Sequence, residues 1–221
     1  MDRGTEDNKC PLCSGIMISP YFQDSRRDYL QCGNCSMVFV PEPFQLSREA
    51  EKAVYDLHRN TPEDQGYRRF LSRLANPMKE RLPAHQSGLD FGCGPGPVLS
   101  LMLEEGGHRM SLYDPYYFNE SAVLDEKYDF ITATEVTEHL CNPAREFRSL
   151  FNMLKDGGLL GIMTKLVIDP DAFSRWHYIH DLTHICFYSR RTFEYLADLY
   201  NTDLEFIGND VIIMRKTAES L

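Results

Sequence analysis

Short apolar runs alternate with stretches of helical periodicity along the chain from Ser87 onward. An alternation of this kind is typical of an α/β domain with a mostly parallel sheet. The last two apolar runs are joined at Gly208-Asn209, which predicts an antiparallel strand pair at the end of the domain. The predicted strands are 87–91, 108–114, 127–134, 159–165, 202–208 and 210–216, and the predicted helices are 97–106, 142–158 and 190–201.

Residues 45–84 carry two further helical patterns. Ser47 can cap the first, and its apolar residues are Ala50, Val54 and Leu57. The second has apolar residues at Phe70, Leu71, Leu74, Met78 and Leu82. Pro77 is expected to kink or split this second helix. The pair also carries Arg59, Arg68, Arg69, Arg73, Lys79 and Arg81, which form either a solvated face or a lid over an anionic substrate or carrier.

Composition places the chain among ordinary globular proteins, with 43% hydrophobic and 25% charged residues in 221. A formal net charge of −10 argues against a dedicated nucleic-acid binder, because phosphate affinity comes mainly from Lys and Arg. No apolar run approaches the roughly 20 residues of a membrane helix. The N-terminal segment has no apolar core like that of a signal peptide, so we expect a cytoplasmic protein.

Two CxxC pairs near the N-terminus, Cys10 with Cys13 and Cys32 with Cys35, have the spacing of a zinc ribbon. Residues 14–30 between them alternate apolar and polar positions, as a hairpin does. The alternatives are two disulfides or core cysteines without a ligand. We expect the ribbon to have a structural or substrate-covering role. The remaining cysteines, predicted to line the core or a pocket, are Cys93, Cys141 and Cys186.

A proline-bearing segment, residues 40–45, ends the cysteine-rich part. We therefore predict a zinc ribbon at 1–44, a helical cap at 45–84 and the α/β domain at 85–221. A ribbon of this size cannot build a core alone, so metal binding is expected to supply its folding free energy.

A glycine-rich loop, "LDFGCGPGPVL", follows the first strand of the α/β domain and opens its first helix. Glycine lets a ligand approach the backbone closely, and the helix N-terminus offers free N–H groups. Asp114 ends the next strand, where a carboxylate can accept hydrogen bonds from ribose hydroxyls. The loop reads D-x-G-x-G-x-G, which disfavours a dinucleotide-binding dehydrogenase.

In these motifs the chain resembles the class I S-adenosylmethionine-dependent methyltransferases, from about Leu89 to the C-terminus. The resemblance implies a Rossmann-like sheet. It implies cofactor binding by Asp90, Phe91, Gly92, Cys93, Gly94, Gly96, Asp114, Pro115, Thr134 and Glu135. One departure is the short interval between Asp114 and Tyr128, so the third strand is short, perhaps residues 121–124, or missing. Tyr117 or Phe118 is then expected to cover the adenine ring.

The segment "EVTEHL" carries an E-x-x-E-H pattern just past the fourth strand of the family. Similar patterns occur in ubiquinone-biosynthesis O-methyltransferases and in small-RNA 3'-terminal 2'-O-methyltransferases. The second resemblance implies a divalent site, Mg²⁺ or Mn²⁺, formed by Glu135, Glu138, His139 and His184. The plain structural alternative is that the carboxylates stabilise a helix start and that His139 packs or contacts the cofactor.

Further histidines stand in "RWHYIHDLTH", where Asp181 is placed to orient His184. Without a metal, His139, His177 or His180 is the candidate general base. These features predict a methyltransferase that modifies a hydroxyl of a small molecule or carrier-attached substrate. One alternative is an RNA 2'-O-methyltransferase that binds its RNA substrate through the ribbon and the arginine-rich helices. The other is a noncatalytic zinc-ribbon module with a degraded methyltransferase fold.

Overall fold

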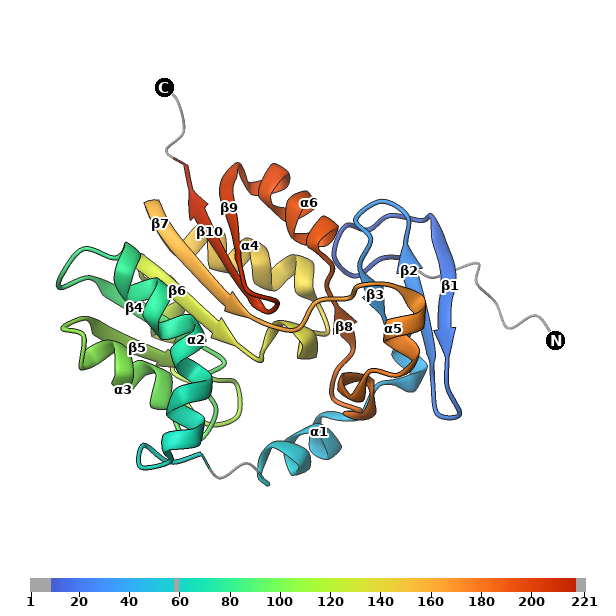
Figure 1. Ribbon diagram of the computed structural model, residues 1–221, viewed down its shortest axis with the longest axis horizontal. Coiled ribbons are helices and arrows are strands. Elements are labelled where there is room, and N and C mark those ends of the chain that lie inside the picture. The colour runs from blue at the N-terminus through green and yellow to red at the C-terminus, as the bar shows by residue number, and fades with distance from the viewer. Residues whose placement is uncertain (1–8, 58–59, 218–221) are drawn as a thin grey trace.

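A computed structural model describes residues 9–57 and 60–217 (Figure 1). The strands are β1 (Ile18–Gln23), β2 (Asp28–Cys32), β3 (Val38–Phe39), β4 (Ser87–Phe91), β5 (Arg109–Tyr113), β6 (Tyr128–Thr134), β7 (Leu154–Met163), β8 (Cys186–Phe187), β9 (Thr202–Ile207) and β10 (Val211–Lys216). The helices are α1 (Arg48–Tyr55), α2 (Gln65–Arg81), α3 (Val98–Glu104), α4 (Pro143–Met153), α5 (Pro170–Ser174) and α6 (Arg190–Tyr200). Four short 3₁₀ helices are η1 (Glu42–Phe44), η2 (Ser121–Asp125), η3 (Thr137–His139) and η4 (His177–His180).

The larger sheet has the order β5-β4-β6-β7-β10-β9. Its first four strands are parallel, and β10 pairs antiparallel with both β7 and β9, which confirms the predicted terminal strand pair. Within the described residues no strand lies beyond β5, so the third strand of the family is missing. Residues 121–124 were a candidate for it and instead belong to η2. Because β4, β5 and β6 run parallel, their carboxyl ends lie at one common edge of the sheet.

Both faces of this sheet are buried, as a parallel sheet requires. Phe130 and Leu159 pack with α2 and α3, whereas their chain neighbours Ile131 and Leu160 pack with α4 and α6. Pro77 does not split α2, which is one helix with Leu74 and Met78 buried on the sheet.

The helix predicted at 142–158 ends earlier than expected. α4 stops at Met153, and residues 154–158 begin β7 instead of closing the helix. Gly157, inside β7, takes a positive φ of 76° where the pairing of β7 with β6 shifts register between Leu154 and Leu159.

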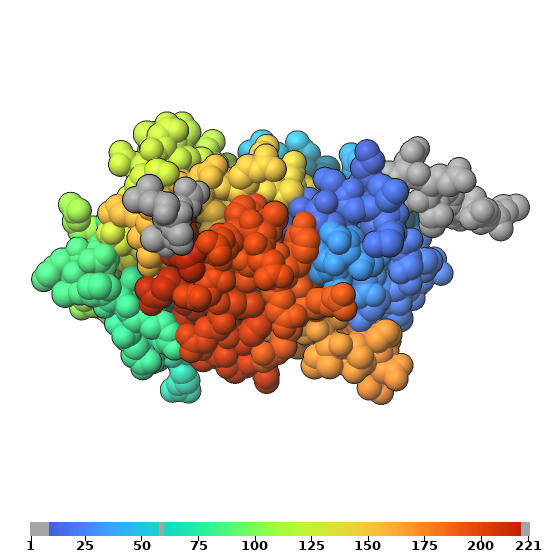
Figure 2. All heavy atoms as spheres, turned by 90° about the horizontal axis from the view of Figure 1, so that it is seen from above, coloured from blue at the N-terminus to red at the C-terminus, as the bar shows by residue number. Residues whose placement is uncertain are grey.

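A second, smaller sheet has the order β1-β2-β3-β8. The hairpin expected between the cysteine pairs is confirmed, because β1 pairs antiparallel with β2. Its last strand comes from far along the chain, since Val38 pairs with Phe187 and Phe39 with Cys186. Figure 2 shows the blue ribbon residues against the orange and red-orange segments that include α5 and α6. The ribbon and the α/β part share one hydrophobic cluster.

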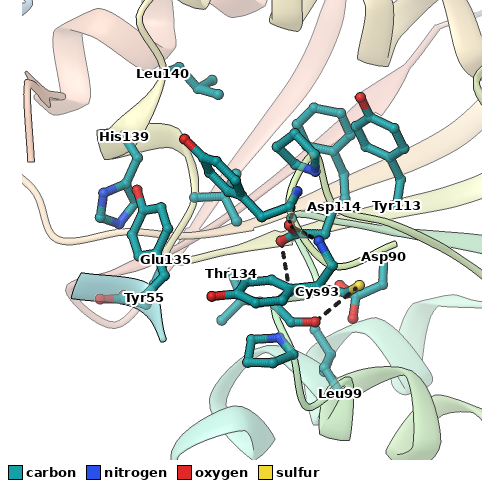
Figure 3. A pocket seen from close by; sticks show the side chains of 18 of the residues that line it. Tyr55, Asp90, Cys93, Leu99, Tyr113, Asp114, Thr134, Glu135, His139 and Leu140 are labelled. Carbon is teal, nitrogen blue, oxygen red and sulfur yellow. Dashed lines mark hydrogen bonds between the residues drawn. The ribbon is translucent and has the colours of Figure 1, made fainter. Parts of the chain in front are cut away.

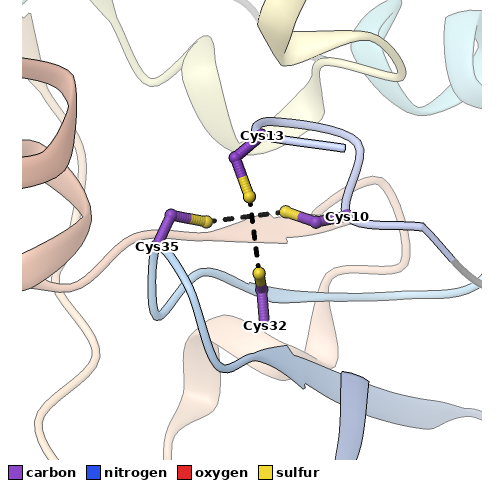
Figure 4. A group of neighbouring side chains, drawn as sticks. All are labelled: Cys10, Cys13, Cys32 and Cys35. Atoms are coloured by element: carbon purple, nitrogen blue, oxygen red, sulfur yellow. Dashed lines mark hydrogen bonds between the residues drawn. The ribbon is translucent and has the colours of Figure 1, made fainter. Parts of the chain in front are cut away.

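The four N-terminal cysteines converge on one point (Figure 4). Their sulfurs lie within 4.8 Å of one another, and the pairs Cys10–Cys35 and Cys13–Cys32 are 3.5 Å apart. All are free thiols, so the disulfide alternative is excluded. Zinc bonded to four sulfurs at about 2.3 Å has sulfurs about 3.8 Å apart, so this arrangement fits a tetrahedral zinc.

Crossing a bilayer requires a longer and more apolar helix than any found in residues 9–57 and 60–217.

Candidate functional site

A cavity of about 1090 Å³ lies at the carboxyl ends of β4, β5 and β6, bordered by α1 and the first turns of α2. Figure 3 shows His139 and Tyr55 on one side of it and Asp114 on the other. Every residue predicted to bind the cofactor lines it, namely Asp90, Phe91, Gly92, Cys93, Gly94, Gly96, Asp114, Pro115, Thr134 and Glu135. The volume exceeds the range of about 300–1,000 Å³ usual for one small-molecule site.

The glycine loop turns sharply between β4 and α3. Gly92 and Gly94 both take positive φ, 74° and 63°, and the Gly92 amide donates to the Tyr113 carbonyl at 2.7 Å. A side chain at Gly96 would place its Cβ 2.3 Å from the Asn60 carbonyl oxygen. Gly92 and Gly94 are thus required for their backbone conformation, and Gly96 is required because a side chain has no space there.

Gly92→Ala is expected to destabilise the protein more than Gly94→Ala. Both add about 1–2 kcal/mol of left-handed strain. Only at position 92 does the new Cβ meet a neighbour, at 2.5 Å from Val136, whereas nothing lies within 4 Å at position 94. The overpacking adds about 1–3 kcal/mol. Urea unfolding of both variants measures the difference. Val136→Ala should recover stability in the Gly92→Ala background and not in the Gly94→Ala background. Equal losses in the free energy of unfolding for the two single variants would contradict this packing.

Two aspartates fix the loop relative to the strands. Asp90 is buried and accepts hydrogen bonds from the hydroxyls of Ser100 and Thr132, both at 2.9 Å. Burial raises the pKa of Asp90 to about 6. Asp114 accepts from the amide of Gly94 at 3.0 Å. The carboxylate expected to hold a ribose is thus anchored by the same loop that would approach the ligand.

α1 lies across the end of β5 and is held there by two tyrosine hydroxyls. Tyr116 donates to Glu51 at 2.7 Å, and Tyr117 donates to Asp56 at 2.8 Å. No α1 residue is buried, so these contacts, more than a core, keep the helix in place. Tyr117 lines the cavity, as expected for a residue covering adenine, whereas Phe118 does not and instead forms a bridge with Asp114.

Glu138, His139 and His184 form a group of potential metal ligands with one ligand atom each within 4.8 Å of the others. Nδ1 of His139 donates to the Thr183 carbonyl at 3.1 Å, and Nδ1 of His184 donates to the Tyr178 carbonyl at 2.8 Å. A neutral ring protonated on Nδ1 carries its lone pair on Nε2. Metal-binding histidines are commonly oriented by such carbonyl contacts.

Glu138 has no exposed surface. Its carboxylate accepts hydrogen bonds from the hydroxyls of Tyr178 and Thr137. Burial raises the pKa of Glu138, and the neighbouring His184 opposes that rise. A carboxylate buried in this way is stabilised by a positive partner, which a cation supplies.

Glu135, the predicted fourth ligand, is not part of this group. It directly follows β6 in a left-handed conformation, φ 52°, which costs a residue other than glycine about 1–3 kcal/mol. Its Oε1 is buried without a hydrogen-bond partner among the described residues, and burial raises its pKa to about 8. The structure therefore joins three of the four predicted ligands and leaves Glu135 as a strained residue of the cavity wall.

The three candidate bases have different surroundings. His139 and His177 line the cavity, and His177 Nε2 lies 2.8 Å from the ammonium of Lys165. His180 does not line it; its ring is exposed, with Nδ1 3.4 Å from Arg26. Of the two histidines of η4, only His177 therefore reaches the cavity, which makes His180 the weaker candidate base. Asp181, which was expected to orient His184, lies 3.8 Å from Nε2 of that ring, and the Tyr178 carbonyl takes the orienting place at Nδ1 instead.

Three of the six basic residues that could grip RNA form ion pairs with carboxylates. Arg68 pairs with Glu105, Arg73 with Asp210 and Arg81 with Glu205. Arg59 lies outside the described residues. These ion pairs lower the positive charge that the RNA alternative would use on this face.

Sequence reasoning missed several cavity residues. Tyr67 and Phe70 of α2 stack on each other, and both line the cavity together with Glu51, Tyr55 and Lys165. The aromatic pair belongs to the apolar face of α2, so only its early position in the helix could have indicated a ligand.

Comparisons with known proteins agree with this geometry. A family model described as a methyltransferase domain matches residues 58–205. The ubiquinone biosynthesis O-methyltransferase of Proteus mirabilis is 32% identical over 35% of this chain, and that of Aeromonas salmonicida is 29% identical over 38%. The matches span 32% and 35% of those two relatives, so the chain matches only about a third of their length.

A solved structure extends the likeness in fold. It is the 1,6-didemethyltoxoflavin N1-methyltransferase of Burkholderia thailandensis with bound 1,6-didemethyltoxoflavin and S-adenosylhomocysteine. It is 14% identical, with a TM-score of 0.52, and the match covers 90% of this chain and 100% of that one.

Proposed function

Because this chain belongs to the methyltransferase-domain family, we propose that it transfers the methyl group of S-adenosylmethionine to a hydroxyl oxygen of a small molecule or carrier-attached substrate. The proposal rests on the position of Glu138, His139 and His184. Two of these three side chains line the same cavity as the glycine loop and Asp114. One cavity thus offers a cofactor wall and an acceptor wall.

On the cofactor wall, the backbone of the glycine loop and the carboxylate of Asp114 would hold S-adenosylmethionine, which supplies a methyl group on a positively charged sulfur. Tyr67 and Phe70 border the same space and exclude water from it. The absent third strand leaves adenine to Tyr117 and to Leu124 of η2, which also line the cavity.

On the acceptor wall, a hydroxyl becomes a good nucleophile only as its proton is lost. A divalent cation held by Glu138, His139 and His184 would lower the pKa of a neighbouring hydroxyl. One carboxylate and two imidazoles suit Mn²⁺, Fe²⁺ or Zn²⁺ better than Mg²⁺, and such a set leaves positions open for two adjacent hydroxyl oxygens. The oxygen–methyl bond forms as the sulfur–methyl bond breaks, and the hydroxyl proton passes to His177 or to solvent.

We also assign zinc to the four N-terminal cysteines, where it would stabilise the ribbon.

Cofactor binding gives the first test. We expect S-adenosylhomocysteine to bind the protein in titration calorimetry and Asp114→Asn to weaken that binding by about 10–100-fold. The new amide group would face the amide of Gly94, and an unsatisfied buried donor costs about 1–3 kcal/mol. Asp125→Asn, at the exposed end of η2, is the matched control and should leave the affinity unchanged. Absence of binding by the unaltered protein would sink the proposed activity.

Acceptor chemistry gives the second test. Turnover of S-adenosylmethionine is measured with Mn²⁺ on 1,2-dihydroxybenzene and 1,3-dihydroxybenzene probes, each repeated with a chelator that spares the ribbon zinc. Metal-dependent methylation of the adjacent diol alone supports the proposal. Equal, metal-independent rates on both probes would remove the metal from it, and methylation confined to RNA bearing a 3'-terminal diol would change the substrate class.

A further inference from the structure

The tip of the ribbon hairpin contains a buried arginine. Arg27 follows the turn between β1 and β2 and is 2% exposed. Its guanidinium donates to the backbone carbonyls of Ile179 at 2.9 Å, Asp181 at 3.0 Å and Leu182 at 3.1 Å. Its Nε donates to the Tyr29 hydroxyl at 2.8 Å. Four of the five N–H groups of the guanidinium are therefore used, and three of the four acceptors are backbone atoms of one distant segment.

Burying the charge of Arg27 costs free energy that an apolar side chain would not cost. Its presence therefore indicates a task that an apolar side chain cannot perform. The carboxylate of Asp24 accepts from the backbone amide of Arg27 and not from its guanidinium. Among the described residues, no carboxylate forms an ion pair with Arg27. Burial of a charge without an ion-pair partner is offset only by its hydrogen bonds. The contacts of Arg27 thus serve to fix the carbonyls of Ile179, Asp181 and Leu182.

Those carbonyls lie, along the chain, between the two carbonyls that orient the candidate metal-ligand histidines. The Tyr178 carbonyl accepts from His184, and the Thr183 carbonyl accepts from His139. Residues 179, 181 and 182, which Arg27 holds, lie between these two. A shift of this short segment would rotate both imidazoles, because each Nδ1 follows its carbonyl.

We infer that Arg27 is a positioning residue that lets the zinc ribbon set the orientation of His139 and His184. The inference rests on the proposed metal-assisted function. The ribbon would thereby act on the active site, because Arg27 fixes the backbone of residues 178–183. Binding of the divalent metal would depend on that fixed backbone.

Arg27→Met and Arg27→Lys test this inference in the full chain. With Mn²⁺ alone as the probe, Arg27→Met should bind it about 10–100-fold more weakly, the loss typical when the partners of metal ligands are removed. Zinc content and affinity for S-adenosylhomocysteine should not change. Arg27→Lys should recover part of the loss, because one ammonium reaches fewer carbonyls than the guanidinium fork. Arg26→Met is the matched control, since Arg26 is exposed and contacts the same segment only at 3.3–3.4 Å.

A second readout needs no metal. The Nδ1 protons of His139 and His184 are followed by ¹H–¹⁵N NMR of the imidazoles, and we expect both to exchange faster in Arg27→Met. If the unaltered protein binds no Mn²⁺ but these protons change, the metal proposal fails and the positioning role stands. Unchanged Mn²⁺ affinity and unchanged protons in a zinc-loaded variant would overturn the inference. Should Arg27→Met not fold, the same two measurements on Arg27→Lys decide.

Discussion

Cys35→Ser is expected to abolish zinc binding and to unfold the ribbon at room temperature. Apparent zinc-binding free energies in small zinc-finger peptides are about 10–16 kcal/mol, which matches or exceeds the whole stability of a typical domain, about 5–15 kcal/mol. The sulfur of Cys35 is fully buried and lies 3.5 Å from that of Cys10, so no other described side chain can replace it. Zinc content and the rate of proteolysis within residues 10–44 measure the effect.

Cys141→Ser is the control for this experiment, because Cys141 is exposed and lies outside the sulfur cluster. We expect it to retain one zinc per chain. Full zinc occupancy and unchanged protease resistance in Cys35→Ser would contradict a structural metal. The loss should also reach the active site, since unfolding of β3 removes the partner of β8 and unfolding of the hairpin releases Arg27.

Glu138→Gln is expected to lower turnover by about 10²–10⁴-fold, the range associated with loss of an activating group, while stability is unchanged or rises. The amide has the shape of the carboxylate, and its oxygen can still accept from the Tyr178 hydroxyl. It carries no charge, so it removes the cost of burying a carboxylate and also the main attraction for a cation. Mn²⁺ titration, turnover and urea unfolding of the same variant separate the two effects.

The control for Glu138→Gln is His85→Asn. His85 is exposed, has a positive φ that asparagine tolerates, and contacts only the Gly107 carbonyl. Normal turnover with Glu138→Gln would remove the metal group from the mechanism. Lost turnover together with a large loss of stability would make Glu138 a structural residue.

The parts of the fold that follow from local pattern were predictable. β4, β6, β9 and β10 lie where short apolar runs placed them, and the glycine loop between β4 and α3 follows from residue type alone. Strand β7 begins earlier than expected, because a glycine pair after a helix reads equally well as its end. Pro77 was expected to kink or split its helix and does not split it; burial of Leu74 and Met78 on the sheet outweighs the one missing hydrogen bond.

What the sequence could not supply is long-range pairing. β3 and β8 have two residues each, too few for a period, so nothing local indicates that Val38 meets Phe187. Arg27 is one of many arginines and shows its role only when residues 179–182 come beside it. The metal group was predictable as a motif, yet the backbone conformation of Glu135, which separates it from the other three, depends on the turn after β6.

The pairing of β3 with β8 also sets an order of events during synthesis. Cys35 leaves the ribosome early, so the two CxxC pairs could bind zinc before most of the chain is synthesised. The open edge of β3 must then wait for residue 187, roughly 7–30 s at translation rates of about 5–20 residues per second. Throughout that interval a nascent chain carries the β1–β2–β3 segment with unpaired backbone groups along β3, the feature by which strands of neighbouring chains associate. Expression at high ribosome density, where such chains crowd together, is therefore the condition under which this protein is most exposed to aggregation.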